Sequence, residues 1–231
     1  MFDSFVSSHD SIKNLCGIAQ KSGLTGFCFV QDFKNTQKPK AAENVTFGTE
    51  IGFEYETHER IALELALSDF DYTVNTVNTV DGINLAERTY YSARSRNEAY
   101  SRYLEKVFDS LDAAYDFSVI AAPAAVSLNT YYPSPALMYR EFPDLLDSIL
   151  MRTVFLGKGI ELDASGFDVF GQPLPHESVL RRYRELNGEI ITVGSHSLPG
   201  RNIKKAYDLL VSCGFDFVTV FKGGKPEMIK L

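Results

Sequence analysis

A chain of 231 residues with 45% hydrophobic and 23% charged residues has the size and composition of an ordinary globular protein, which excludes a disordered or fibrous class. The formal net charge is −7, and Lys and Arg form no basic stripe, so nucleic-acid binding has no electrostatic support. The three cysteines, Cys16, Cys28 and Cys213, lie far apart without CxxC spacing, which argues against a zinc knuckle or a redox pair.

No apolar run approaches the roughly 18 residues that a membrane-spanning helix needs. The N-terminus also lacks a basic region followed by an apolar stretch, which a secretory signal would have. We therefore expect a cytoplasmic protein that does not contact membranes. The sequence indicates no oligomeric state.

Short runs rich in β-branched and aromatic residues alternate along the chain with longer stretches that have helical spacing. The predicted strands are 2–7, 25–31, 45–53, 72–80, 117–122, 158–163, 190–195 and 216–221, followed by a turn toward 226–230. The predicted helices between them are 11–22, 57–68, 95–114, 141–156, 177–187 and 200–213. Gly188 and Gly214 follow two of these helices, as is typical of helix ends.

Strands that alternate with helices over this length indicate either a closed parallel barrel or a doubly wound open sheet. An open sheet usually has a glycine-rich turn after its first strand, whereas residues 7–11 (SSHDS) contain no glycine. We therefore predict a single-domain α/β protein over residues 1–231, with a parallel barrel inside and helices outside.

The functional site of a parallel barrel lies at the carboxyl ends of its strands. In this sequence those ends carry mostly polar residues, with little histidine. They are Ser7, Gln31, Asp32, Glu50, Glu54, Asn75, Asn78, Ala122, Asp163, Ser195 and His196.

Four segments, taken in their order and spacing, resemble the polymerase-and-histidinol-phosphatase (PHP) family in its histidinol-phosphatase branch. The clearest is 180–231, which contains IITVGSHSLPG and VTVFKGGKPEM and is similar to the family's Gly-Ser-Asp-Ala-His strand end and closing Val-Phe-Lys-Gly-Arg-Lys-Pro hairpin. The others are FDYTVNTVNTVDG at 70–82, GTEIGFEYE at 48–56 and GIELDASGF at 159–167.

This resemblance implies a distorted barrel of the (β/α)7 type that binds three metal ions and hydrolyses a phosphomonoester, usually histidinol phosphate in histidine biosynthesis. In such a reaction the metals generate a hydroxide and bind the phosphate oxygens. Ligand sets of imidazole and carboxylate suit zinc, iron or manganese.

Most of the metal-ligand positions that the resemblance implies hold other residue types in this chain. The positions, in chain order, are Phe5, Ser7, Asp32, Glu50, Asn78, Ala122, His196 and Leu198. Glu50 keeps the bridging glutamate, but His196 and Leu198 stand where the family has aspartate and histidine. The remaining five positions replace histidines.

Phenylalanine, alanine and leucine have no lone pair for a cation, and serine is a poor neutral ligand. The sequence therefore predicts that the three-metal centre does not form. Asp32, Glu50 and His196 remain as metal-capable side chains, so the cofactor is either absent or one divalent ion of zinc, iron or manganese. The alternative is a polar barrel mouth without a metal.

Asn78 and Arg201 are the candidate substrate-binding residues. Arg201 precedes a helix, where backbone N–H groups favour anions. We expect a surface or capping role for His9, a solvated His58 and a structural role for His176. The resemblance implies that Glu161 is a carboxylate that either faces the core or supports a metal ligand. We also expect the six aligned residues Phe5, Asp32, Glu50, Asn78, Ala122 and His196 to converge on one cavity.

Two functional hypotheses follow. The first is a pseudoenzyme, a degenerate barrel with weak or no phosphatase activity that binds a small ligand, phosphorylated or not, or a protein partner. The second is a metal-dependent phosphomonoester hydrolase that acts on histidinol phosphate through a reduced metal site. Residue chemistry favours the first hypothesis, and the resemblance as a whole favours the second.

Overall fold

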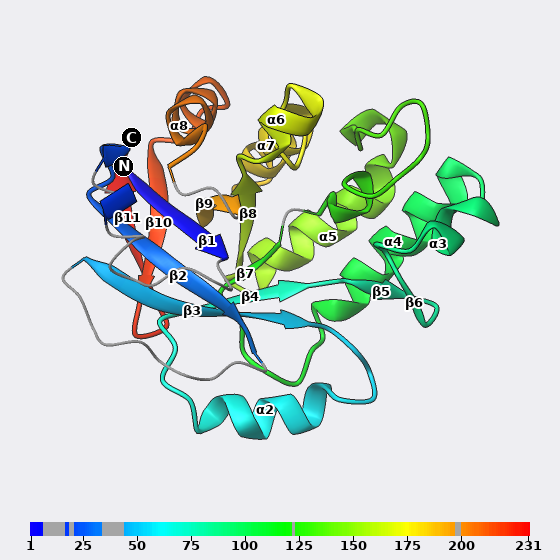
Figure 1. Cartoon of the computed structure of the whole chain (residues 1–231), viewed down its shortest axis with the longest axis horizontal. Helices are drawn as coiled ribbons and strands as arrows, with labels where there is room; N and C mark the ends of the chain where they lie inside the picture. The colour runs from blue at the N-terminus through cyan, green and yellow to red at the C-terminus, as the bar shows by residue number, and fades with distance from the viewer. Residues whose placement is uncertain (7–16, 19–20, 34–43, 122, 197–199) are drawn as a thin grey trace.

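The computed structural model describes residues 1–6, 17–18, 21–33, 44–121, 123–196 and 200–231. Seven parallel strands close into a barrel in the order β1-β2-β3-β4-β7-β8-β9, with β9 paired to β1 (Figure 1). The prediction of a closed parallel barrel is therefore confirmed, and the open sheet is excluded. The barrel strands are β1 (Phe2–Val6), β2 (Gly26–Asp32), β3 (Val45–Gly52), β4 (Tyr72–Thr76), β7 (Val119–Ile120), β8 (Gly159–Asp163) and β9 (Ile191–His196).

Helices surround the barrel, and five of them match predicted helices to within a few residues. The predicted helix at 11–22 falls largely outside the described residues, of which 17, 18 and 21 are helical. The short helices α3 and α6 and the two 3₁₀ turns were not predicted. The helical segments are α2 (His58–Ala66), α3 (Arg88–Ser92), α4 (Arg96–Ser110), η1 (Ala125–Ser127), η2 (Tyr139–Glu141), α5 (Pro143–Phe155), α6 (Gly166–Phe170), α7 (Glu177–Glu185) and α8 (Ile203–Ser212).

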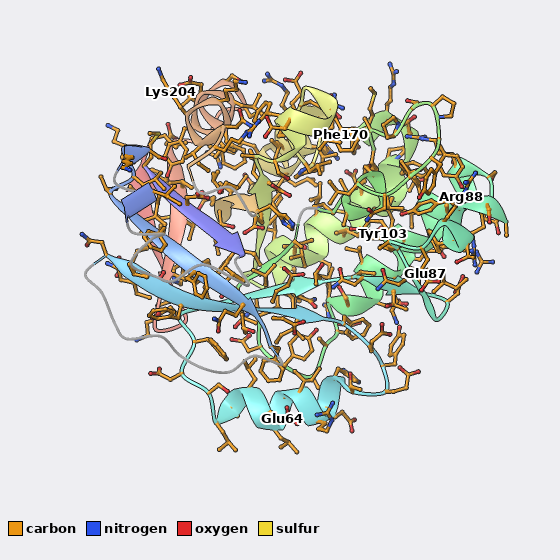
Figure 2. All side chains as sticks on the ribbon, viewed as in Figure 1. Glu64, Glu87, Arg88, Tyr103, Phe170 and Lys204 are labelled. Carbon is orange, nitrogen blue, oxygen red and sulfur yellow. The ribbon has the colours of Figure 1, made fainter. Side chains whose placement is uncertain are left out.

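Helix α4 illustrates why these segments are helical. Ser95 caps its first turn, because the Ser95 side chain accepts a hydrogen bond from the Glu98 backbone N–H at 3.2 Å. Buried residues then recur three and four apart, including Tyr100, Tyr103 and Leu104, so one stripe of the helix packs against the protein core. Figure 2 shows Tyr103 among the packed helices, whereas Glu64 and Lys204 lie on the outer surface.

The fourth predicted strand, 72–80, is shorter than expected and is followed by a small hairpin. Strand β4 ends at Thr76, and β5 (Thr79–Val80) pairs with β6 (Ile83–Asn84). The turn between them is Asp81-Gly82, and both residues have positive φ, at 53° and 74°. An Asp-Gly pair with two positive φ angles is the preferred turn of a two-residue hairpin. The prediction of one continuous strand was therefore wrong.

The hairpin of β10 (Phe217–Lys222) and β11 (Lys225–Lys230) covers the amino end of the barrel. Asp71 anchors its turn, since Asp71 Oδ1 accepts a hydrogen bond from Gly223 N at 2.8 Å and Asp71 O accepts one from Gly224 N at 3.1 Å. The Phe221 ring packs on Tyr72 at the start of β4, with centroids 5.4 Å apart. The carboxyl end is therefore the end that remains available for a site.

The barrel interior is filled by a cluster that includes Cys28, Val30, Tyr72, Val74 and Val119. Cys28 is buried there, a position that is typical of an inert thiol. A larger apolar cluster lies between the strands and the helices. Within the described ranges, no helix is long and apolar enough to cross a membrane.

Candidate functional site at the carboxyl end of the barrel

Strand alternation determines which side chains face the barrel axis. Cys28 and Val30 lie in the interior cluster, so Asp32, the next alternate residue of β2, faces the same side at the strand's carboxyl end. In β3, a Cβ added at Gly48 would meet the Cys28 Sγ, which places Gly48 on the interior face and Glu50 with it. The register pairs Asp32 with Glu50, so the two carboxylates lie side by side at the mouth.

Glu50 is the centre of this group. Burial is the largest cause of its raised pKa, which the charge of His196 and a hydrogen bond from Asn78 partly offset, while Asp32 and Asp163 raise the pKa further. Side chains that follow or end β2, β4, β8 and β9 thus act on the Glu50 carboxylate of β3. The structure therefore brings together Asp32, Glu50, Asn78 and His196, four of the six residues expected to converge.

The other two aligned residues are only partly placed. The backbone of Phe5 lies in register with His196 of β9, at the mouth end of β1. Ala122 lies outside the described residues, as do Ser7 and Leu198. Their convergence stays a prediction, although the sequence alone shows that phenylalanine and alanine supply no lone pair.

Two residues expected on the polar rim face away from it. Asn75 is buried, donates a hydrogen bond to Ser110 O at 2.9 Å, and accepts one from the Tyr115 hydroxyl at 2.8 Å. Ser195 is also buried and donates to Asp3 Oδ2 at 2.7 Å. Because adjacent strand residues point to opposite faces, both side chains lie between the barrel and the helices. Placing them on the rim was wrong.

Arg201, a candidate substrate-binding residue, is engaged by another partner. Its Nε lies 2.8 Å from Asp168 Oδ2, and its Nη2 lies 3.2 Å from Asp168 Oδ1. A hydrogen bond from Asn202 is the largest cause of the lowered pKa of Asp168, with Arg201 contributing as well. The guanidinium therefore ties the segment before α8 to helix α6, and its contact with a substrate stays a prediction.

Glu161 lies in the barrel below the mouth. The Tyr72 hydroxyl donates to Glu161 Oε2 at 2.9 Å and also contacts Thr192 Oγ1 at 2.8 Å. Burial is the main cause of the strongly raised pKa of Tyr72, so this hydroxyl remains a proton donor. Glu161 therefore faces the core, which is one of the two positions that the resemblance implies.

The described histidines outside the mouth have structural partners. His58 Nδ1 accepts a hydrogen bond from Ala114 N at 3.0 Å, and its half-buried ring packs edge-on against Phe53, so the prediction of a solvated His58 was wrong. His176 is the N-cap of α7, where its Nδ1 accepts from Ser178 N at 3.1 Å. His9 lies outside the described residues.

The side chains at the mouth do not fit a three-metal centre. In the described part of the chain, no three His, Cys, Asp or Glu side chains are grouped to hold a metal ion. Asn78 instead gives Glu50 a hydrogen bond that stabilises the carboxylate. This amide hydrogen occupies one of the roughly four lone-pair sites of the carboxylate.

A closed parallel barrel of seven strands with a polar carboxyl end defines an α/β barrel protein, and comparisons with known proteins narrow that class. No family model matches the chain. It is 26% identical over 188 residues to a probable histidinol-phosphatase of Clostridium acetobutylicum (78% of this chain, 72% of that one). It is 22% identical over 191 residues to the histidinol-phosphatase of Lactococcus lactis (80% and 71%).

Among solved structures, the chain matches the crystal structure of the Lactococcus lactis histidinol phosphate phosphatase complexed with zinc, L-histidinol and phosphate. The TM-score is 0.85 at 20% sequence identity, over 98% of each chain. This match establishes the fold, and the sequence relatives share the same name. In sequence the chain is therefore similar to curated histidinol-phosphatases, and in fold it matches a histidinol phosphate phosphatase.

Proposed function

We propose that this protein is a histidinol-phosphatase-like barrel that binds a small ligand at its carboxyl end and has weak or no phosphatase activity. The observation that carries the proposal is the environment of Glu50. In the family this carboxylate bridges metals, whereas here it accepts a hydrogen bond from the Asn78 amide and interacts with the charge of His196.

The loss of the metals follows from the chemistry of the donors. A divalent ion held by one or two protein groups stays mostly hydrated and binds weakly. Three such ions a few ångströms apart also repel one another unless many anionic ligands surround them. Phe5, Ala122 and Leu198 supply no ligand atom, and Asn78 supplies a neutral amide.

The charges at the mouth support a cationic group as the part of the ligand that binds first. Asp32, Glu50 and Asp163 contribute carboxyls, and His196 is the basic group that acts on Glu50. Without metal ions this arrangement attracts an ammonium or imidazolium group and repels a phosphate. The related crystal structure holds L-histidinol together with phosphate, and L-histidinol carries the cationic groups that this mouth favours.

A second candidate function is a metal-dependent phosphomonoester hydrolase with a reduced metal site. The residue types of Asp32, Glu50 and His196 favour it, because carboxylate and imidazole are suitable ligands for one zinc, iron or manganese ion. These three side chains are not grouped to hold an ion in the structure, so metal binding would have to draw them together. The two functions differ in whether ligand binding requires a metal.

Calorimetric titration separates the two functions. We expect L-histidinol to bind in the presence of EDTA, and Glu50→Gln to weaken this binding at least about tenfold. Glu59→Gln, at an exposed position of α2, is the matched control and should leave binding unchanged. Binding that appears only when zinc, iron or manganese is added would support the hydrolase instead. No binding under either condition would refute both.

A further inference from the structure

Residues 121–142 connect β7 to α5. This connection leaves β7 at the carboxyl end of the barrel, where the loops of a parallel barrel form the rim of the site. Its described part contains only two 3₁₀ turns, η1 and η2. A segment with so little regular structure needs other partners for its backbone groups.

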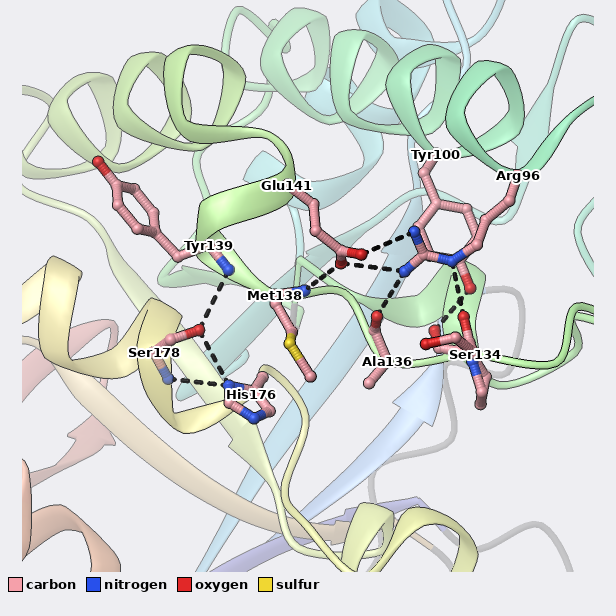
Figure 3. A network of polar contacts seen from close by, with 10 residues as sticks. Arg96, Tyr100, Ser134, Ala136, Met138, Tyr139, Glu141, His176 and Ser178 are labelled. Atoms are coloured by element: carbon pink, nitrogen blue, oxygen red, sulfur yellow. Dashed lines mark hydrogen bonds and ion pairs between the residues drawn. The ribbon is translucent and has the colours of Figure 1, made fainter.

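Arg96, the first residue of α4, supplies many of these partners (Figure 3). Its Nε donates to Ser134 O at 2.6 Å, and its Nη2 donates to Ala136 O at 2.6 Å. The same guanidinium pairs with both carboxylate oxygens of Glu141, at 3.1 and 3.0 Å. Its planar fork therefore holds two points of the connection that are several residues apart.

Tyr100 completes this anchor one turn further along α4. Its hydroxyl donates to Pro135 O at 2.6 Å, and the Arg96 Cζ lies 4.4 Å from the centre of its ring. Three successive carbonyls, at residues 134–136, are thus satisfied by side chains of one helix. The placement of this segment depends on Arg96 and Tyr100 rather than on its own backbone pairing.

The anchored segment is joined to the mouth by a chain of hydrogen bonds. Glu141 Oε2 accepts from Met138 N at 3.0 Å, and the neighbouring Tyr139 N donates to Ser178 Oγ at 3.1 Å. Ser178 N donates in turn to His176 Nδ1 (Figure 3).

Two residues before His176, Leu174 exchanges backbone hydrogen bonds with Asp163, at 2.7 and 3.1 Å. Asp163 is one of the carboxyls that act on Glu50. Hydrogen bonds and short stretches of backbone therefore link Arg96 to the edge of the candidate site.

We propose that Arg96 is a positioning residue of the barrel mouth. It fixes residues 134–141 and, through Ser178 and His176, the segment 174–178 that borders Asp163. It contacts no ligand itself and acts through the placement of this edge. The inference rests on the proposed function in one respect: the mouth must bind a ligand. The affinity for that ligand then measures how well this edge is positioned.

The test compares Arg96→Ala with Arg96→Lys and with Arg102→Ala. Arg102 lies on the same helix and pairs with Asp81 at 2.8 Å and Glu98 at 3.5 Å, away from the connection. Hydrogen exchange of residues 134–141 and 174–178 is measured together with calorimetric binding of L-histidinol in EDTA. Urea denaturation establishes that each variant is folded.

Arg96→Ala should speed exchange in both segments and weaken binding about tenfold, with Arg96→Lys intermediate and Arg102→Ala unchanged. Exchange that stays protected in segment 174–178 of folded Arg96→Ala would overturn the inference, as would faster exchange with unchanged affinity. Failure of the wild type to bind L-histidinol is a different result, which refutes the proposed function. The exchange of segment 174–178 then decides the inference alone.

Discussion

The purified protein is expected to hydrolyse histidinol phosphate at least about a thousandfold more slowly than the Lactococcus lactis histidinol-phosphatase. Metal ions that activate water and neutralise phosphate supply several kcal/mol of barrier reduction. Because each ~1.4 kcal/mol corresponds to a tenfold change in rate, losing two of three ions is sufficient for this effect. The measurement is phosphate release with zinc, iron or manganese added in turn.

Glu50→Ala provides the internal reference for this assay. If the remaining activity is a slow background, the variant should match the wild type. Robust turnover that disappears in Glu50→Ala would show that Glu50 holds a working metal, and the reduced-site hydrolase would then replace the pseudoenzyme. Glu59→Ala controls for the loss of a carboxylate at the surface.

The second large effect concerns Asp3, a buried carboxyl between β1, β9 and the segment before α8. Burial raises its pKa to about 8, although hydrogen bonds from Gly200 N and the Ser195 hydroxyl oppose the shift. Its other oxygen, Oδ1, has no hydrogen-bond partner among the described residues. Asp3 is therefore protonated in the folded protein at pH values where it is ionised in the unfolded chain.

This difference determines the sign of the pH dependence. Between the ordinary pKa of about 3.9 and the folded pKa, unfolding releases the Asp3 proton. Rising pH therefore lowers the free energy of unfolding by up to roughly 1.4 kcal/mol per pH unit, and the effect levels off above the folded pKa of about 8. The stabilising contribution of protonated Asp3 is fully present below the unfolded pKa.

Asp3→Asn isolates this contribution, because asparagine accepts the same two hydrogen bonds and does not titrate. Its stability relative to the wild type, from urea denaturation between pH 5 and pH 9, should increase with pH. Asp116 has a side chain that is 89% exposed, so the free energy of unfolding of Asp116→Asn should change with pH in parallel with that of the wild type. Parallel curves for Asp3→Asn and the wild type would contradict a raised pKa at Asp3.

The sequence was sufficient to predict the barrel, because the alternation of short strand-like runs and helical stretches is a local pattern that repeats along the chain. The closing hairpin was also readable, since the apolar run at 216–221 is followed by Gly223 and Gly224, whose φ angles of 52° and 73° make the turn. The assembly of Asp32, Glu50 and His196 at one end followed from their positions at strand ends. No structural information was needed for those expectations.

Other features depend on contacts that no local pattern records. In β4 the Asn75 side chain faces away from the barrel axis, toward the helices. Asn78 follows the end of β4 and lies near Glu50, so its position depends on where that strand ends. Arg96 is separated from its partner Glu141 by 45 residues, and Arg201 from Asp168 by 33, so neither pairing had a sequence signal. Asp163 stood at a strand end, but without the environment of Glu50 nothing assigned it to the site.

The metal content of the purified protein tests the central claim most directly. After purification without chelators and dialysis against zinc, iron and manganese at low concentration, the ions bound per chain are counted by mass spectrometry. We predict fewer than one tightly bound ion per chain, and the same value for Glu50→Gln. Three ions per wild-type chain, lost in Glu50→Gln, would contradict this prediction.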